Sequence, residues 1–275
     1  MRIRFVRNIS AIARPAWPAC HTPVARTSEG SELHTRSRGA WMSAYSSDLD
    51  SGTSGPVEAT RRMNRMYRRQ RHIYNATRRY YLLGRDRLIA GLRPEAGANL
   101  LEIGCGTGRN LVLAARRHPK ARFFGIDVST EMLTSAISAI SRRGLTDQIR
   151  VAHGDGTAFN PERLFGIRSF DHVLISYSLS MIPEWRRVLQ AAASHLKPGG
   201  RLHVVDFGDQ ERLPGIARAL LRRWLALFDV TPRDDLARVL SDMAETTGAD
   251  LKFERPFRGY AQYAVLTLPP GPATP

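Results

Sequence analysis

Glycines at three alternate positions, Gly104, Gly106 and Gly108, follow an apolar run, and Glu102 stands two residues before the first of them. Glycine lacks a β-carbon, so such a loop lets backbone N–H groups approach a ligand closely. The spacing differs from the G-x-G-x-x-G fingerprint of dinucleotide-binding proteins. A carboxylate at Glu102 would repel a pyrophosphate and attract a positively charged ligand. The loop therefore predicts a site for a cationic small molecule.

Two further acids end predicted strands, where ligands of parallel α/β sheets bind. Asp127 closes the strand expected over residues 122–128, and Asp155 follows the strand expected over 150–153. Asp127 can accept hydrogen bonds from both hydroxyls of a ribose, or it can cap the following helix, whose predicted N-cap is Ser129. Asp155, followed by Gly156, can accept from an adenine amino group or form an Asp-Gly turn. Met132 is expected either as an apolar wall for the base or as part of the core.

The segment from Glu102 to Gly108 resembles the first motif of class I S-adenosyl-L-methionine (SAM) methyltransferases. The resemblance implies SAM as cofactor and no metal. It also implies cofactor contacts by the strand ends and the loops after them. The predicted cofactor-binding residues are Glu102, Gly104, Cys105, Gly106, Gly108, Asp127, Val128, Met132, Asp155, Gly156 and Ser176. Glu102 either binds the methionyl ammonium or holds the glycine loop, and Cys105 is expected as a small loop residue and not as a nucleophile.

The segment after the fourth predicted strand, where the methyl acceptor is expected, reads Ser176, Tyr177, Ser178. It has neither the Asn/Asp-Pro-Pro-Tyr motif typical of enzymes that methylate adenine or glutamine nitrogens nor a cysteine for carbon methylation of RNA. These absences favour a small-molecule or lipid acceptor. An α-amine has a reference pKa near 8 and is partly neutral at pH 7, so its methylation needs no strong general base.

Strands and helices alternate regularly after residue 99 and predict a doubly wound α/β sheet. Strands are expected over 100–103, 122–128, 150–153, 170–176 and 201–206, with a closing hairpin over 251–257 and 261–268. Helices are expected over 109–117, after Ser129, and over 184–195. The resemblance implies a Rossmann-like, seven-stranded, mostly parallel sheet with an antiparallel last strand, preceded by N-terminal helices. The expected parts are a disordered basic tail (1–60), an amphipathic helical segment (61–94) and the methyltransferase domain (95–270).

Residues 66–86 resemble the bacterial diacylglyceryl-homoserine N-methyltransferases, which trimethylate the homoserine amine of a betaine lipid with SAM. The resemblance implies this reaction and a helix folded over the cofactor. Tyr67, Tyr74 and Tyr80, together with Tyr177, are the substrate-side candidates. Tyrosine rings can stabilise a growing methylammonium by cation–π contact. The same tyrosines at helical spacing equally fit the core side of an amphipathic helix.

Positive charge is the second marked feature of the chain. The 275 residues carry a formal net charge of +16, with 43% hydrophobic residues and two cysteines. The charge predicts attraction to polyanions, and no apolar run is long enough to span a bilayer. Two cysteines cannot build a disulfide framework, so a reducing cytoplasm is expected.

Residues 213–228 place Leu220, Leu221, Trp224, Leu225 and Phe228 on one side, with Arg218, Arg222 and Arg223 opposite. This composition is typical of an interfacial helix, or of a lid over the substrate. The preferred interpretation is an enzyme bound peripherally to the inner face of an anionic membrane, with a lipid substrate as partner. A quinone, phosphatidylethanolamine or other small-molecule methyltransferase is the nearest alternative. An RNA methyltransferase or a non-catalytic SAM-binding module remains as a further alternative.

Overall fold

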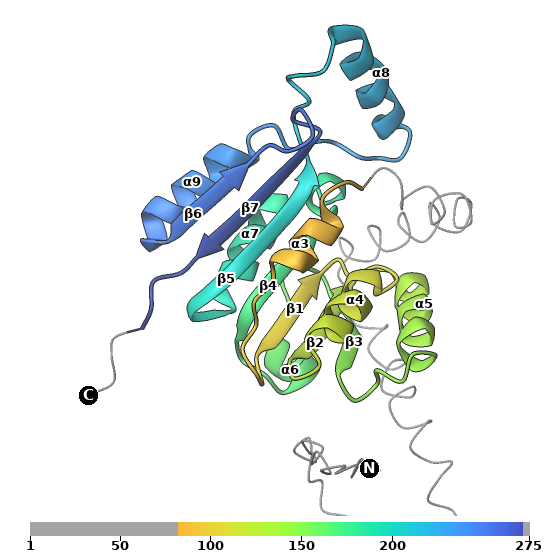
Figure 1. Cartoon of the computed structure of the whole chain (residues 1–275), viewed down its shortest axis with the longest axis vertical. Coiled ribbons are helices and arrows are strands. Elements are labelled where there is room, and N and C mark those ends of the chain that lie inside the picture. The colour runs from red at the N-terminus through yellow and green to blue at the C-terminus, as the bar shows by residue number, and fades with distance from the viewer. Residues whose placement is uncertain (1–81, 272–275) are drawn as a thin grey trace, which may run out of the picture. The chain divides into compact units, whose positions relative to one another are not determined.

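The computed structural model describes residues 82–271, and every structural statement below concerns this part of the chain (Figure 1). The predicted tail over 1–60 and residues 61–81 of the predicted helical segment over 61–94 lie outside the described residues. Of that helical segment, α3 (Arg85–Gly91) is described. Gly84 precedes it with φ +90°, and the helix ends at Gly91.

Seven strands form one mixed sheet in the order β3-β2-β1-β4-β5-β7-β6. Strands β1 to β5 pair in parallel, whereas β7 pairs antiparallel with both β5 and β6. This confirms the predicted seven-stranded sheet. The strands are β1 (Asn99–Ile103), β2 (Arg122–Asp127), β3 (Ile149–His153), β4 (Phe170–Ser176), β5 (Leu196–Phe207), β6 (Asp250–Glu254) and β7 (Ala261–Thr267).

The register brings the carboxyl ends of the central strands level with one another. Ile103 at the end of β1 pairs with Ile126 in β2 and with Ile175 in β4. Asp127 in turn pairs with His153 at the end of β3. The loops that follow β1, β2, β3 and β4 therefore leave the sheet along a single edge.

Helices cover both faces of the sheet (Figure 1). In that view α3, α4 and α5 lie over one face and α6, α7 and α9 over the other, while α8 extends beyond the end of the sheet. Their bounds are α4 (Arg109–Arg117), α5 (Thr130–Ser141), α6 (Pro161–Phe165), the 3-10 helix η3 (Leu179–Met181), α7 (Trp185–Ser194), α8 (Gly215–Ala226) and α9 (Leu236–Thr247). The predicted cap of α5 is confirmed, because Ser129 Oγ accepts a hydrogen bond from Met132 N at 3.3 Å.

The short helices α6 and η3 were not predicted, and two larger elements also differ from the sequence-based expectations. Helix α9 was not predicted, although it buries Leu236, Leu240 and Ala244 at intervals of four residues. Strand β5 begins at Leu196, five residues before the strand that was expected over 201–206. The pairing of β4 with β5 shifts register between Phe170 and His172, which accommodates the Pro-Gly-Gly sequence.

Two buried histidines bond to each other between β4 and β5. His172 Nδ1 lies 3.0 Å from His203 Nε2, so one ring donates and the other accepts. Burial, and then Arg201, lower the pKa of His172 to about 4, with Asp171 opposing and His118 adding to the shift. Burial, and then His172, lower the pKa of His203 to about 3. Both rings are therefore neutral at pH 7.

This pair predicts acid-sensitive stability. The unfolded chain takes up protons at these histidines near pH 6.5, whereas the folded chain resists protonation until about pH 4 at His172. Stability is therefore full above pH 6.5 and is lost as the pH falls toward 4. When the pH is lowered from 7 to 4.5, the depressed pKa of His172 alone should reduce the free energy of unfolding by about 2 kcal/mol. Urea titrations at both pH values measure it.

The matched variants are the double substitution His172→Asn with His203→Gln, and His153→Gln on the exposed end of β3. The double variant should be less stable at pH 7 and lose less stability on acidification than the wild type. The His153→Gln variant should keep the wild-type pH dependence. An unchanged slope in the double variant would show that the pair does not govern acid stability.

Candidate functional site

The glycine loop joins β1 to α4 at the edge where the strand ends meet. Gly104, Gly106 and Gly108 have φ values of +72°, +54° and +70°, a region that side chains strongly disfavour. The N–H groups of Gly104 and Cys105 both donate to the Ile126 carbonyl, at 2.9 and 3.0 Å. The loop therefore curls over the end of β2.

Close packing also demands glycine at position 104. A β-carbon there would lie 2.6 Å from Ser178 Cβ. Ser178 in turn donates from Oγ to the Ile103 carbonyl at 3.2 Å, which ties the segment after β4 to the end of β1. The loop after β1 and the segment after β4 are thus in direct contact.

Asp127 connects three backbone segments at the end of β2. Its Oδ2 accepts from Gly106 N at 2.7 Å, and its Oδ1 accepts from Ser129 N at 2.9 Å. The carboxylate thus holds both the glycine loop and the start of α5. A carboxylate can accept several hydrogen bonds, so this structural role is compatible with a ribose contact. The ribose role stays a prediction beside this observed structural role.

Glu102 lies beneath the loop and not on its open side. The residue is 1% exposed, and its Oε1 accepts from Asn110 Nδ2 at 2.7 Å. Of the two predicted roles, this geometry supports holding the loop, while direct contact with an ammonium stays a prediction. Asn110 was not among the predicted site residues, although a polar side chain in the first turn of the predicted helix over 109–117 was a signal for it.

The electrostatics of the loop suit a cation. Burial raises the pKa of the Cys105 thiol well above its usual value, and the carboxylates of Asp127 and Glu102 raise it further. Cys105 is therefore a neutral thiol packed inside the loop, as predicted for a small loop residue. Two carboxylates that disfavour a thiolate also favour an ammonium or sulfonium nearby. By the chemistry of these groups, the residues fit SAM.

Asp155 forms a tight turn after β3. Its Oδ1 accepts from both the backbone N and the Oγ1 of Thr157, each at 2.8 Å. The next residue, Gly156, packs so closely that a β-carbon would lie 2.6 Å from Ile103 Cγ2. The turn is the structural alternative weighed for Asp155, and the adenine contact stays a prediction.

The other predicted cofactor residues lie around these loops. Val128, between Asp127 and Ser129, is partly exposed, whereas Met132 in the first turn of α5 is 2% exposed. Ser176 ends β4 and is 7% exposed. Within the described part of the chain, Ser176 Oγ is buried and has no hydrogen-bond partner. A buried hydroxyl without a partner at this edge is a candidate donor or acceptor for a ligand.

Tyr177 is the one substrate-side candidate that the structure describes. Its φ is +55°, its side chain is buried, and its hydroxyl donates to the Leu83 carbonyl. Its ring lies edge-on to Phe207 with centroids 4.7 Å apart. Burial, and then Asp206, raise the pKa of this phenol well above its usual value. Tyr177 thus joins the segment before α3 to the end of β4. Tyr67, Tyr74 and Tyr80 lie outside the described residues.

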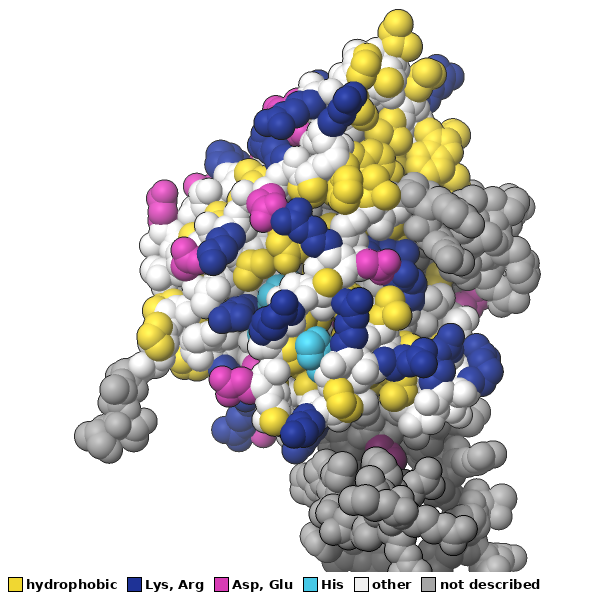
Figure 2. All heavy atoms as spheres, viewed as in Figure 1, with side chains coloured by type: hydrophobic (Ala, Val, Ile, Leu, Met, Phe, Trp, Pro, Cys, Tyr) yellow, Lys and Arg dark blue, Asp and Glu magenta, His cyan; other side chains and the backbone are white. Residues whose placement is uncertain are grey.

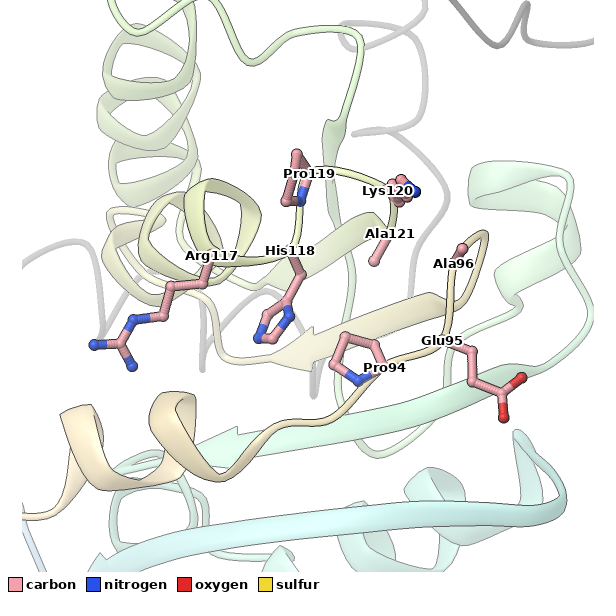
Figure 3. A pocket seen from close by; sticks show the side chains of 8 residues that line it. All are labelled: Pro94, Glu95, Ala96, Arg117, His118, Pro119, Lys120 and Ala121. Atoms are coloured by element: carbon pink, nitrogen blue, oxygen red, sulfur yellow. The ribbon is translucent and has the colours of Figure 1, made fainter.

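A pocket of about 280 Å³ opens at the opposite edge of the sheet (Figure 3). It is lined by Pro94, Glu95, Ala96, Arg117, His118, Pro119, Lys120 and Ala121. These residues precede β1 and β2, so the pocket lies where those strands begin. It is therefore separate from the site that the strand ends form. Among the described residues no cluster of three or more His, Cys, Asp or Glu side chains suits a metal ion.

Residues 101–202 match the family Methyltransf_12, described as a methyltransferase domain. A demethylmenaquinone methyltransferase of Listeria monocytogenes is 30% identical over 125 residues, which are 45% of this chain and 50% of the relative. Nocamycin O-methyltransferase of Saccharothrix syringae is 33% identical over 132 residues, 47% of this chain and 45% of the relative. The chain spans about half the length of the curated relatives it matches.

Solved structures share the fold at low sequence identity. Mitomycin 7-O-methyltransferase MmcR aligns with a TM-score of 0.59 and 20% identity over 76% of this chain and 60% of that one. Phosphoethanolamine N-methyltransferase 2 of Haemonchus contortus, solved with SAM, aligns with a TM-score of 0.54 and 16% identity over 67% and 52%. The described part of the chain therefore has the class I methyltransferase fold, as the glycine motif and the strand–helix alternation predicted. The methyl donor of this class is SAM, which confirms the predicted cofactor.

Substituting Gly104 tests the close packing of the loop. Gly104→Ala adds a clash with Ser178 to the cost of a positive φ and should destabilise the protein by about 2 kcal/mol or more. The matched control is Gly144→Ala, since Gly144 has φ +65° but no neighbour within 4 Å of a β-carbon. That variant should lose only about 1 kcal/mol. Thermal unfolding compares them, and equal losses would contradict the packing argument.

Removing the negative charge of Asp127 tests its predicted ribose contact. Asp127→Asn should weaken SAM binding about tenfold to a hundredfold, because charged acceptors form the stronger hydrogen bonds. Isothermal titration calorimetry measures the affinity. Asp250→Asn on the exposed edge strand β6 is the control and should bind SAM as the wild type does. Wild-type affinity in Asp127→Asn would mean that the ribose lies elsewhere.

Proposed function

We propose that this chain is a SAM-dependent methyltransferase acting on a small, lipid-soluble acceptor. The observation that carries the proposal is the acidic glycine loop, held by Asp127 and Glu102 at the strand ends of a class I methyltransferase fold. SAM supplies a methyl group already activated by its sulfonium. The protein's contribution is then to align the acceptor and to exclude water.

The ionisable groups near the end of β4 support this limited role. Asp206 is fully buried, and its carboxylate accepts from the backbone N–H groups of Phe207 and Ser180 at 2.8 and 3.2 Å. Burial raises the pKa of Asp206. Tyr177 directs its hydroxyl at the Leu83 carbonyl. Both side chains hold backbone in place, so they position the segment that an acceptor would approach.

The similarity to demethylmenaquinone and nocamycin methyltransferases favours a quinone-like or natural-product acceptor. Both names describe organic small molecules, and each match covers a little under half of this chain. We therefore place methylation of such an acceptor first. It is the alternative that the sequence analysis kept beside the betaine-lipid interpretation.

Methylation of the homoserine amine of diacylglyceryl-homoserine is the second candidate. It is favoured by one specific observation, the resemblance of residues 66–86 to the betaine-lipid N-methyltransferases. In that reaction Tyr67, Tyr74 and Tyr80 would surround the growing methylammonium. Both candidates share an apolar acceptor that partitions into a bilayer.

The purified full-length protein should transfer isotope-labelled methyl groups from SAM to one lipid-soluble acceptor and not to RNA. Parallel reactions contain demethylmenaquinone, diacylglyceryl-homoserine or phosphatidylethanolamine in detergent micelles, or total tRNA. Mass spectrometry then reports one added methyl for the quinone and up to three for the amine. Transfer to tRNA alone would overturn the proposal, and so would SAM binding without transfer to any of the lipids.

A further inference from the structure

Large hydrophobic side chains are exposed at one end of the described domain. They are Leu83, Ile216, Leu220, Leu227 and Phe257, with exposed fractions of 37%, 80%, 65%, 72% and 48%. Figure 2 shows hydrophobic side chains gathered over α8, at the end of the molecule beyond the sheet. Phe257 lies next to the start of α3, since its ring is 3.7 Å from where a β-carbon of Gly84 would be. These side chains lie on α8 and on the loops at the carboxyl ends of the parallel strands.

Helix α8 and its last turn carry an apolar stripe that faces away from the domain. Ile216, Leu220, Arg223 and Leu227 follow one another at intervals of three or four residues, so they lie on one side of the helix. All four are exposed. This we call the outer stripe. It differs from the predicted apolar side, which included Leu220 but not Ile216 or Leu227.

The opposite side of α8 packs on the domain. Leu225 is buried, and Leu221, Trp224 and Phe228 pack against the core around it. The rings of Trp224 and Phe228 meet edge to face with centroids 5.1 Å apart. The helix therefore has two apolar sides, and only the inner one is covered by the described residues.

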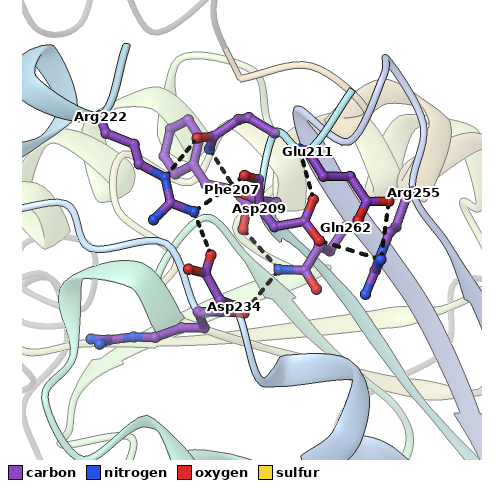
Figure 4. A network of polar contacts seen from close by, with 10 residues as sticks. Phe207, Asp209, Glu211, Arg222, Asp234, Arg255 and Gln262 are labelled. Atoms are coloured by element: carbon purple, nitrogen blue, oxygen red, sulfur yellow. Dashed lines mark hydrogen bonds and ion pairs between the residues drawn. The ribbon is translucent and has the colours of Figure 1, made fainter. Parts of the chain in front are cut away.

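Arg222 fixes the orientation of α8 (Figure 4). Its guanidinium donates to Asp234 Oδ1 at 2.7 Å, to Gln210 Oε1 at 3.2 Å and to the Asp209 carbonyl at 3.2 Å. Asp209 and Gln210 precede the helix and Asp234 follows it. Arg222 was predicted among the arginines opposite the apolar side, but it joins the segment before α8 to the segment after it. The outer stripe is thus presented outward by a braced helix.

The charges on α8 and its last turn are all positive, and the acidic residues Glu211 and Asp229 lie just outside this segment. Residues 212–228 contain four arginines and no acidic residue. Arg222 is used internally, whereas Arg212 and Arg223 are exposed, and Arg258 is exposed beside Phe257. An apolar surface flanked by arginines is complementary to lipid acyl chains beneath anionic head groups. Two copies pairing through the same stripe would instead bring their Arg223 residues together.

We propose that the outer stripe of α8 docks this protein onto the surface of an anionic bilayer. Ile216, Leu220 and Leu227 enter the boundary between head groups and acyl chains, and Arg223 contacts lipid phosphates. The docking itself does not require the proposed function. Only its purpose rests on that function, because docking would bring the strand ends near a lipid-soluble acceptor. Among the described residues, no helix is long and apolar enough to cross a membrane, so the contact is with its surface.

The test is flotation of the full-length protein with phosphatidylcholine vesicles, with and without phosphatidylglycerol. The wild type should float with the anionic vesicles. The triple variant Ile216→Ser, Leu220→Ser, Leu227→Ser should lose about tenfold or more in vesicle affinity, because three apolar contacts are removed. Its SAM affinity and far-UV circular dichroism should match the wild type, which shows that the domain is intact.

A matched pair of charge reversals tests the role of the arginine. Arg223→Glu should weaken binding to the anionic vesicles about tenfold, since it replaces an attraction with a repulsion. Arg142→Glu makes the same charge change at the exposed end of α5, near the amino ends of the strands, and should bind as the wild type does. Equal losses in the two variants would show dependence on net charge alone and would contradict docking by α8.

Three other results would overturn the proposal. The wild type could fail to float with anionic vesicles. The triple variant could float as well as the wild type, which would assign binding to the arginine-rich segment before residue 82. The wild type could be a dimer that the triple variant dissociates, which would assign the stripe to a second copy. None of these three results depends on methyl transfer. The proposed function is tested separately, by measuring SAM binding and product formation, so its failure can be distinguished from failure of the docking proposal.

Discussion

The site depends on the hydrogen bonds that the carboxylate of Asp127 accepts from the backbone. The carboxylate accepts one backbone N–H from the glycine loop, at Gly106, and one from the start of α5, at Ser129. Loops that change direction at a sheet edge leave backbone donors unpaired, and an unpaired buried donor costs about 1–3 kcal/mol. One side chain at the end of β2 meets this requirement for two neighbouring connections. The position of the glycine loop is therefore fixed by the end of β2 as much as by its own sequence.

Glycine is required at this edge for close packing as well as for the approach of a ligand. Gly104 lies against Ser178, and Gly156 lies against Ile103, each too close for a β-carbon. The loops after β1, β3 and β4 are thus in contact around the ends of the central strands. Glu102, bonded to Asn110 beneath the loop, adds negative charge without being exposed. The result is a closely packed, electronegative edge suited to a cationic ligand.

Local patterns in the sequence predicted the part of this structure that local interactions determine. The glycine spacing, the Ser129 cap and the strand–helix alternation up to Asp206 each depend on residues close in the chain, and each is confirmed. Contacts between distant residues were missed, such as the bond of Arg222 to Asp234 and the closure of Tyr177 onto Leu83. The presence of apolar residues on two sides of α8 was also not predicted. Periodicity gives the spacing of apolar residues but not which side of the helix the rest of the domain covers.

Amide hydrogen exchange with and without SAM tests the central claim most directly, since it locates the ligand without presuming a reaction. We expect SAM to slow exchange in the loop over residues 103–110, at the start of α5 and around Ser176. We also expect no change around the pocket lined by Pro94 and His118 at the opposite edge. Protection confined to that pocket, or unchanged exchange at the glycine loop, would contradict the claim that the ends of the strands bind the cofactor.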